Sequence, residues 1–135
     1  MSGNSPAPYD INHHGGLRGL DPERRLAYRE RSVYLFLTDS QLLVASAGGQ
    51  FRVRPKKLLF GLDRAGLRCE WFDYSELKTR YRNFMFFLPD GQWMGIGVQV
   101  VVFGKENQWA TRCDEFVAQL GAAASEIDWR NPPPL

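Results

Sequence analysis

The stretch from Gln92 to Leu120 constrains the fold more than any other part of the chain. Its first part, Trp93 to Phe103, is apolar at every second position, which predicts a long β-strand. Its second part, Asn107 to Leu120, has apolar residues at helical spacing, which predicts an amphipathic helix. The expected apolar face of this helix consists of Trp109, Cys113, Phe116, Val117 and Leu120. A last strand that runs into such a helix predicts a curved sheet covered by a helical plug.

Short β-strands separated by turns fill most of the preceding chain. We expect strands over residues 32–38, 41–47, 51–54, 57–62, 67–74 and 81–88. Gly48-Gly49 and Pro89-Asp90-Gly91-Gln92 are turn signals between them, and Ser75-Glu76-Leu77 predicts a bend. This spacing predicts a mainly β fold: an antiparallel barrel or roll of about six or seven strands, closed by the C-terminal amphipathic helix.

The chain of 135 residues has the length of one domain, which we place at residues 17–125. Residues 1–16 are rich in Ser, Gly, Pro and Asn and predict a disordered arm. Residues 126–135 form a Pro-rich tail that cannot continue a helix. Asp21-Pro22-Glu23 is a helix start signal and predicts a short helix over Pro22 to Glu30.

Several features predict a cytoplasmic protein without a cofactor. No apolar run approaches the roughly 20 residues of a membrane-spanning helix, and the N-terminus lacks a signal-peptide pattern. Cys69 and Cys113 show no metal spacing and are expected to be free thiols. His13 and His14 have no third ligand at useful spacing, so we expect no metal site.

The sequence offers no catalytic motif, so we expect no catalytic residues. Glu70, Asp73 and Glu76 are the candidates for a paired-carboxylate site. Strand alternation places Glu70 and Asp73 on opposite faces, which favours exposed strand charges instead. A small enzyme with an aromatic-lined barrel pocket is a third hypothesis, and it requires Glu70 or Glu76 inside that pocket.

Basic residues are concentrated in the middle of the chain. Residues 50–82 carry nine Lys and Arg against four Asp and Glu, although the whole chain has a net charge of only +2. One hypothesis is an anion-binding or lipid-binding surface formed by Arg52, Arg54, Lys56, Lys57, Lys78, Arg80 and Arg82. Alternation places the last three on one face about 7 Å apart, a spacing suited to phosphates. The alternative is a solvated face of edge strands, where such charges prevent aggregation. The low net charge disfavours nucleic acid as a partner.

Aromatic residues exceed what the interior of a small barrel needs. On the strand before the Pro-Asp-Gly turn, Phe84 and Phe86 share one face, while Met85 and Phe87 share the other. This pattern predicts an apolar face beyond the core, and hence a protein partner or self-association. The predicted interface residues are Phe84, Phe87, Trp93 and Trp71. The alternative is a core flanked by two helices.

Three segments resemble the bacterial PH and GRAM-type branch of the pleckstrin-homology-like superfamily. Leu37-Thr38-Asp39-Ser40-Gln41-Leu42-Leu43 is similar to its "L-T-x-x-R-L" strand pair. Phe72-Asp73-Tyr74-Ser75-Glu76-Leu77 is similar to its "f-p-Y-s-e-I" segment, and a strand, an Asp-Gly turn, a strand and a helix ending at Leu120 follow. The chain departs from the family at Gln41, which replaces a basic residue, and in the longer stretch from Phe51 to Gly66. Residues 17–122 would be covered.

The resemblance implies a non-enzymatic scaffold that binds lipids, peptides or other subunits, by analogy of fold. Together with the aromatic excess, it favours a binding or scaffolding module for a protein partner or for homo-oligomer assembly. The alternatives are peripheral binding of anionic lipid headgroups through the basic strand face, and the small enzyme.

Overall fold

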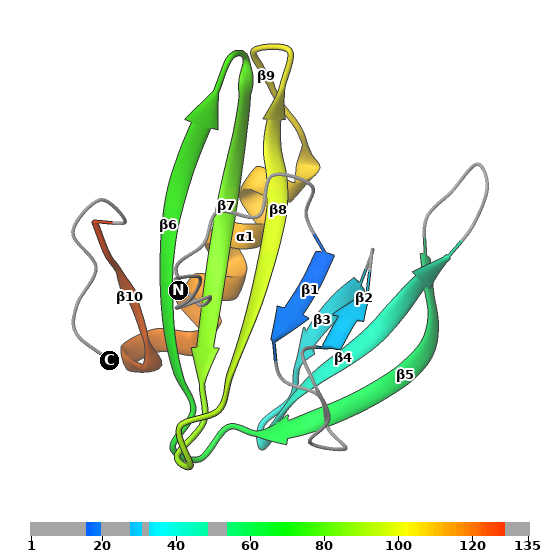
Figure 1. Ribbon diagram of the computed structural model, residues 1–135, viewed down its shortest axis with the longest axis vertical. Helices are drawn as coiled ribbons and strands as arrows, with labels where there is room; N and C mark the ends of the chain where they lie inside the picture. Colours follow the sequence, from blue (N-terminus) through cyan, green and yellow to red (C-terminus); the bar gives the residue numbers. More distant parts are fainter. Residues whose placement is uncertain (1–15, 20–27, 31–32, 49–53, 129–135) are drawn as a thin grey trace, which may run out of the picture.

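The computed structural model describes residues 16–19, 28–30, 33–48 and 54–128, and it is mainly β with one C-terminal helix (Figure 1). The predicted fold class is therefore confirmed. The strands are β1 (Gly16–Gly19), β2 (Tyr28–Glu30), β3 (Val33–Leu37), β4 (Gln41–Gly48), β5 (Arg54–Asp63), β6 (Arg68–Glu76), β7 (Thr79–Phe87), β8 (Trp93–Val102), β9 (Lys105–Glu106) and β10 (Ala124–Glu126). The helix α1 (Gln108–Leu120) is followed by the 3-10 turn η2 (Gly121–Ala123).

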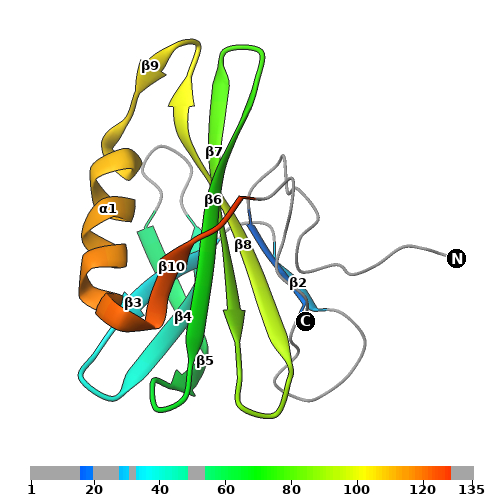
Figure 2. The same ribbon diagram turned by 90° about the vertical axis from the view of Figure 1, so that its left-hand side faces the viewer.

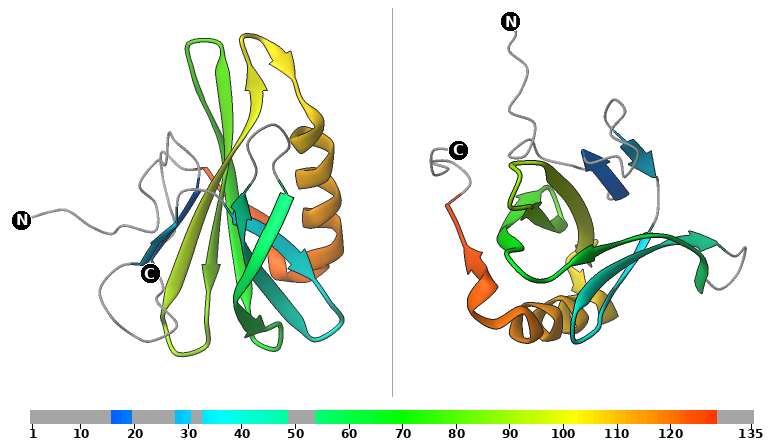
Figure 3. Two further views of the ribbon diagram at one scale, coloured as in Figure 1. Left: turned by 90° about the vertical axis from the view of Figure 1, so that its right-hand side faces the viewer. Right: turned by 90° about the horizontal axis from the view of Figure 1, so that it is seen from below.

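The described strands form two sheets. The larger has the order β10-β6-β7-β8-β1-β2, with β9 paired to β8, and the smaller has the order β3-β4-β5. All pairs are antiparallel except β10 with β6. The larger sheet is curled, and the smaller sheet stands beside it in the view from below (Figure 3).

The main core lies between the two sheets and α1. Figure 2 shows α1 along one side of the β6–β7–β8 hairpins. Fully buried residues from all three parts form one cluster, including Leu42 and Val44 of β4, Phe86 of β7 and Met94 of β8. The predicted apolar face of α1 packs into this cluster, because Cys113 and Leu120 are buried and its other three members are partly buried against it.

Local hydrogen bonds fix the two ends of α1, which lies within the expected range of Asn107 to Leu120. The Asn107 side chain accepts a hydrogen bond from the backbone N–H of Trp109 at 2.9 Å, which caps the first turn. Its Nδ2 donates to the carbonyl oxygen of Gln99 at 2.9 Å and so ties the start of the helix to β8. Gly121 ends the helix at φ 61°, and its N–H donates to the carbonyl oxygen of Val117.

The opposite face of the larger sheet is also apolar. Phe72, Met85 and Phe87 form a second buried cluster, with Tyr74, Trp93 and Ile127 packed against it. Phe84 and Phe86 instead belong to the main core, as strand alternation requires. The predicted division of the Phe84–Phe87 run between two faces is confirmed.

The helix expected over residues 22–30 is wrong at its C-terminal end. Tyr28–Glu30 forms β2, which pairs with β1 through Gly19↔Tyr28 and Leu17↔Glu30. Pairing with a neighbouring strand overrides the local helix signal here, because the hydrogen bonds of a β-ladder satisfy the backbone as fully as those of a helix. The start signal Asp21-Pro22-Glu23 and the rest of the expected helix lie outside the described residues.

The expected domain ends also change in detail. Gly16, the expected last residue of the arm, begins β1, and Glu126, the expected first residue of the tail, ends β10. Sequence reasoning missed both β1, which pairs with β8 and β2, and the edge strand β10. The expected bend at Ser75–Leu77 is the end of a tight β6–β7 hairpin. Residues 1–15 of the arm, including His13 and His14, and residues 129–135 of the tail lie outside the described residues. Within the described ranges, no helix has the length and apolarity needed to cross a membrane.

Both cysteines are free, buried thiols, as predicted. Burial, with a smaller contribution from the charge of Glu70, raises the pKa of Cys69 to about 12. Burial likewise raises the pKa of Cys113 to about 11. Both groups are therefore uncharged thiols at neutral pH, which makes them poor nucleophiles.

We expect iodoacetamide to label Cys69 and Cys113 about a hundredfold more slowly in the folded protein than in the unfolded chain. The reason is that the thiolate is the reactive form and burial suppresses it. Mass spectrometry of samples quenched at successive times would measure both rates. Rapid labelling of either folded thiol would contradict this assignment.

The same pKa shifts predict lower stability in alkali. A thiol with a raised pKa in the folded state stabilises the fold fully below its unfolded pKa, and this contribution is lost as the pH rises through the folded pKa. Because the ordinary value is 9.0 and the Cys69 value is about 12, the free energy of unfolding should fall across pH 9–12. Urea titrations at several pH values should show a flatter decline for Cys69→Ala than for the wild type.

Candidate functional site

The structure separates the described basic residues of the anion-binding hypothesis. Lys57 is exposed on β5 of the smaller sheet, whereas Lys78 is exposed in the β6–β7 turn of the larger sheet. Arg54 and Lys56 lie in β5, but their side chains are outside the described set, as is the whole of Arg52. Figure 1 shows β5 and the β6–β7 turn in different parts of the molecule.

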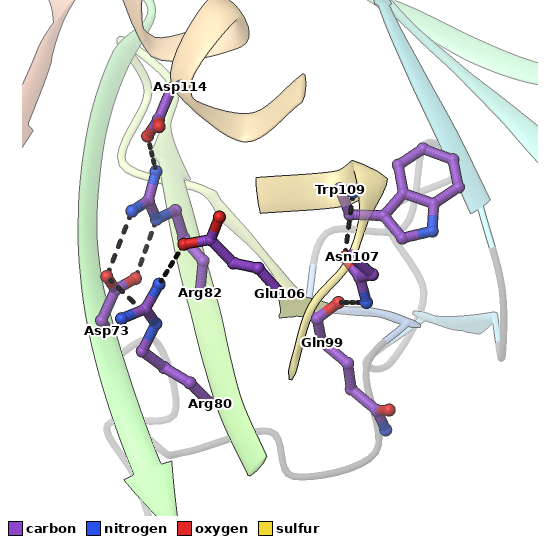
Figure 4. A network of polar contacts seen from close by, with 8 residues as sticks. All are labelled: Asp73, Arg80, Arg82, Gln99, Glu106, Asn107, Trp109 and Asp114. Carbon is purple, nitrogen blue, oxygen red and sulfur yellow. Dashed lines mark hydrogen bonds and ion pairs between the residues drawn. The ribbon is translucent and has the colours of Figure 1, made fainter. Parts of the chain in front are cut away.

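Arg82 is engaged in a polar network that joins two strands to the helix (Figure 4). Its Nε and Nη2 donate to the two carboxylate oxygens of Asp73 at 2.8 and 3.1 Å, and its Nη1 donates to Asp114 of α1 at 2.7 Å. The guanidinium carbon also lies 4.2 Å from the ring centroid of Trp71. Arg82 is only 7% exposed, so these contacts replace its hydration.

The charges in this network leave no excess positive charge for an anion. Arg80 lies 3.7 Å from Glu106 and 4.0 Å from Asp73, so three carboxylates face two guanidinium groups. Burial by itself would lower the pKa of Arg82, but its hydrogen bonds to Asp73 and Asp114 and their negative charges outweigh burial and raise it. The arrangement is suited to holding α1 on the sheet rather than to capturing phosphate.

We expect Arg82→Ala to lower the free energy of unfolding by about 2–3 kcal/mol, because it leaves the half-buried Asp73 without its bidentate partner. Asp114→Asn is the matched control on the same network. The Asp114 side chain is 71% exposed, so its loss should cost less than about 1 kcal/mol. Urea denaturation of both variants measures the difference. Equal losses of stability would contradict the assignment of Asp73 as the main partner of Arg82.

The four predicted interface aromatics are divided between the two faces of the larger sheet. Phe84 is buried in the main core with its ring 5.5 Å from that of Phe116, and Trp71 packs on the same side under Arg82. Phe87 and Trp93 belong to the second cluster on the opposite side. These four residues therefore do not form one continuous surface.

The candidate carboxylates are likewise kept apart. Glu70 is buried and ion-paired with Arg68, while Asp73 lies on the other face with Arg82, as alternation predicted. Glu76 is exposed at the end of β6. Among the described residues, no group of three or more His, Cys, Asp and Glu side chains is placed to hold a metal ion.

The smaller sheet presents an apolar surface that sequence reasoning did not assign. Leu35, Leu37, Leu42 and Val44 turn toward the core, so the alternate positions turn outward. The register aligns Tyr34 with Ala45 and Leu58, and Phe36 with Leu43. We name this surface the outer apolar face; it consists of Tyr34, Phe36, Leu43, Ala45 and Leu58, of which Ala45 is buried between its larger neighbours and Tyr34 and Leu43 are half-buried. Phe36 is 42% exposed and Leu58 is 58% exposed.

Aromatic contacts extend the outer apolar face to the first turn of α1. The rings of Tyr34 and Phe36 stack with centroids 6.1 Å apart, and Tyr34 meets Trp109 edge-on at 5.9 Å. The guanidinium carbon of Arg112 lies 5.3 Å from the Trp109 centroid. Figure 4 shows Trp109 pointing away from the Arg82 network, toward the smaller sheet. Trp, Tyr and Arg are the residue types that dominate binding energy at protein interfaces.

One signal for this surface was present in the sequence. The run Val33-Tyr34-Leu35-Phe36-Leu37 is apolar at every position, which indicates a strand with two apolar faces. A core accounts for only one of them. The exposure of Leu58 depends on a bulge between Val44 and Ala45 in the β4–β5 ladder, which no local pattern indicates.

Comparison of the chain with protein-family models, with curated proteins and with solved structures finds no match.

Proposed function

We propose that this protein is a non-enzymatic binding and scaffolding module that docks a second polypeptide on the outer apolar face. The observation that carries the proposal is the pair of large side chains, Phe36 and Leu58, exposed on a sheet face whose other named members are also apolar. Contiguous exposed apolar surface of this kind marks protein interfaces. The resemblance to PH and GRAM-type domains supports a binding role by analogy.

The edges of the smaller sheet add a second means of docking. Within the described residues, β3 and β5 each pair only with β4, so both outer strands present unpaired backbone groups. A strand of another chain added at either edge would extend the sheet and continue its apolar face. Backbone pairing and apolar contact would then act together in one interface.

We assign a second copy of this chain as the first occupant. An apolar face is complementary to another apolar face, and a twofold interface brings the same surface together from both copies. Every copy of the chain carries this face, so the partner surface is present at the same concentration as the protein itself. This assignment follows the expectation of homo-oligomer assembly drawn from the sequence.

Size-exclusion chromatography with light scattering, over a range of concentrations, tests this proposal. We expect the wild type to dimerise, and the Phe36→Ser/Leu58→Thr variant to dimerise about a hundredfold more weakly. Phe103→Asn is the matched control, because it removes an exposed aromatic side chain from a distant turn and should dimerise like the wild type.

A monomeric wild type that nevertheless retains a protein from lysate, and loses it in the Phe36→Ser/Leu58→Thr variant, would keep the docking face and change its occupant. A monomeric wild type without such a face-dependent partner would overturn the proposal, as would a dimer that the double substitution leaves intact.

A further inference from the structure

Two hairpin turns lie side by side at one end of the larger sheet. The pair Glu76↔Thr79 closes a two-residue loop, Leu77-Lys78, between β6 and β7. The pair Val102↔Lys105 closes another, Phe103-Gly104, between β8 and β9. The backbone N–H of Gly104 donates to the carbonyl oxygen of Lys78 at 2.9 Å and joins the two loops. Figure 1 shows both turns at the same end of the molecule.

Both loops place a large apolar residue where the backbone favours glycine or asparagine. Leu77 has φ 56° and Phe103 has φ 53°, and they are the only non-glycine residues with positive φ in the described ranges. Phe103 and Gly104 at φ 78° have the sign pattern of a type I′ turn, and a positive φ at Leu77 alone has that of type II′. Leucine and phenylalanine are disfavoured in both positions because the Cβ crowds the backbone.

These side chains are also the most exposed large hydrophobic residues in the described part of the chain. Leu77 is 99% exposed and Phe103 is 83% exposed. Neither the turn nor the core explains them, since the turn disfavours them and no packing compensates. Backbone strain and exposed apolar surface coincide twice, on two loops that a hydrogen bond joins. Such local conflicts are concentrated at functional sites.

Each of the two exposed apolar residues has a lysine one or two positions after it in the sequence. Lys78 is next to Leu77, Lys105 is two residues after Phe103, and both are exposed. In the described part of the chain, no ion pair joins either lysine to a carboxylate, whereas the nearby Glu106 is paired with Arg80. This end of the sheet has a net charge of +1, from the cations Lys78, Arg80 and Lys105 and the anions Glu76 and Glu106.

We propose that Leu77 and Phe103 form a membrane-docking tip that inserts into the interfacial region of an anionic lipid bilayer, with Lys78 and Lys105 contacting the headgroups. A bilayer accepts protruding apolar side chains without a complementary pocket, whereas a protein partner needs a shaped one. Lysine next to an inserted apolar residue reaches the anionic surface with its long side chain. The anionic-lipid hypothesis drawn from the sequence is thereby moved from the strand face, where Arg80 and Arg82 are ion-paired, to the turns.

The membrane-docking tip is independent of the proposed function. It is built from the β6–β7 and β8–β9 turns of the larger sheet, whereas the outer apolar face belongs to β3, β4 and β5. A chain docked on the outer apolar face would leave the tip accessible. The two sites can therefore be disabled separately in the full-length protein.

Co-sedimentation with lipid vesicles tests the tip. We expect the wild type to bind vesicles of phosphatidylcholine and phosphatidylserine more tightly than vesicles of phosphatidylcholine alone. Leu77→Asn and Phe103→Asn should each weaken binding about tenfold, and the double variant about a hundredfold, because each removes an inserted side chain. Lys78→Gln/Lys105→Gln should remove most of the preference for phosphatidylserine.

Asparagine tolerates positive φ, so these variants should fold. We expect Leu77→Gly and Phe103→Gly to raise the melting temperature by a few degrees, since glycine relieves the strain, while weakening vesicle binding as much as the asparagine variants do. A variant that gains stability and loses binding cannot owe its loss to unfolding. Ala118→Asn, at an exposed position of α1 outside both turns, is the matched control and should bind vesicles like the wild type.

Wild-type protein that remains in solution with both vesicle types would overturn the proposal. Vesicle binding that survives the Leu77→Asn/Phe103→Asn substitution would do the same. If that variant instead loses a bound protein while vesicles remain unbound by the wild type, the tip is a protein-docking site and the membrane assignment is wrong.

Discussion

The alternation of side chains along β7 is the constraint on which the rest of the structure depends. This strand lies between β6 and β8, so each of its residues points to one of two packed faces. Phe84 and Phe86 meet Phe116 of α1 on one side, while Met85 and Phe87 fill the second cluster on the other. A shift of one residue in register would exchange the two sets, which ties the helix, both apolar clusters and the polar network to one pairing.

The polar end of the same strand face shows how position changes the role of a basic residue. Arg82 lies on the same face of β7 as Phe84 and Phe86, but at a point where Asp73 of β6 and Asp114 of α1 converge on it. Its charge is thereby used within the fold, where loss of one partner is costly because the group is nearly buried. Lys78 and Lys105, at the turns, keep their charge available to solvent.

Exposed apolar side chains occur at two separate places, and different physics keeps each of them there. On the outer apolar face, Phe36 and Leu58 continue a sheet whose other side is already buried, so the surface has the flat shape that another chain can cover. At the membrane-docking tip, Leu77 and Phe103 protrude from strained turns, a shape suited to a deformable surface. A scaffold that joins a protein interface to a membrane contact would use both.

Periodicity alone determined the class of fold, the strand β8, the helix α1, and the division of Phe84–Phe87 between two faces. These features depend on residues a few positions apart, which a sequence displays directly. Tertiary structure decided the rest. The pairing of Tyr28–Glu30 with β1 replaced an expected helix end, Arg82 met a carboxylate 32 positions away, and two turns came together through Gly104 and Lys78. Long-range register determines which charges are neutralised and which apolar residues stay uncovered, and no local pattern encodes that register.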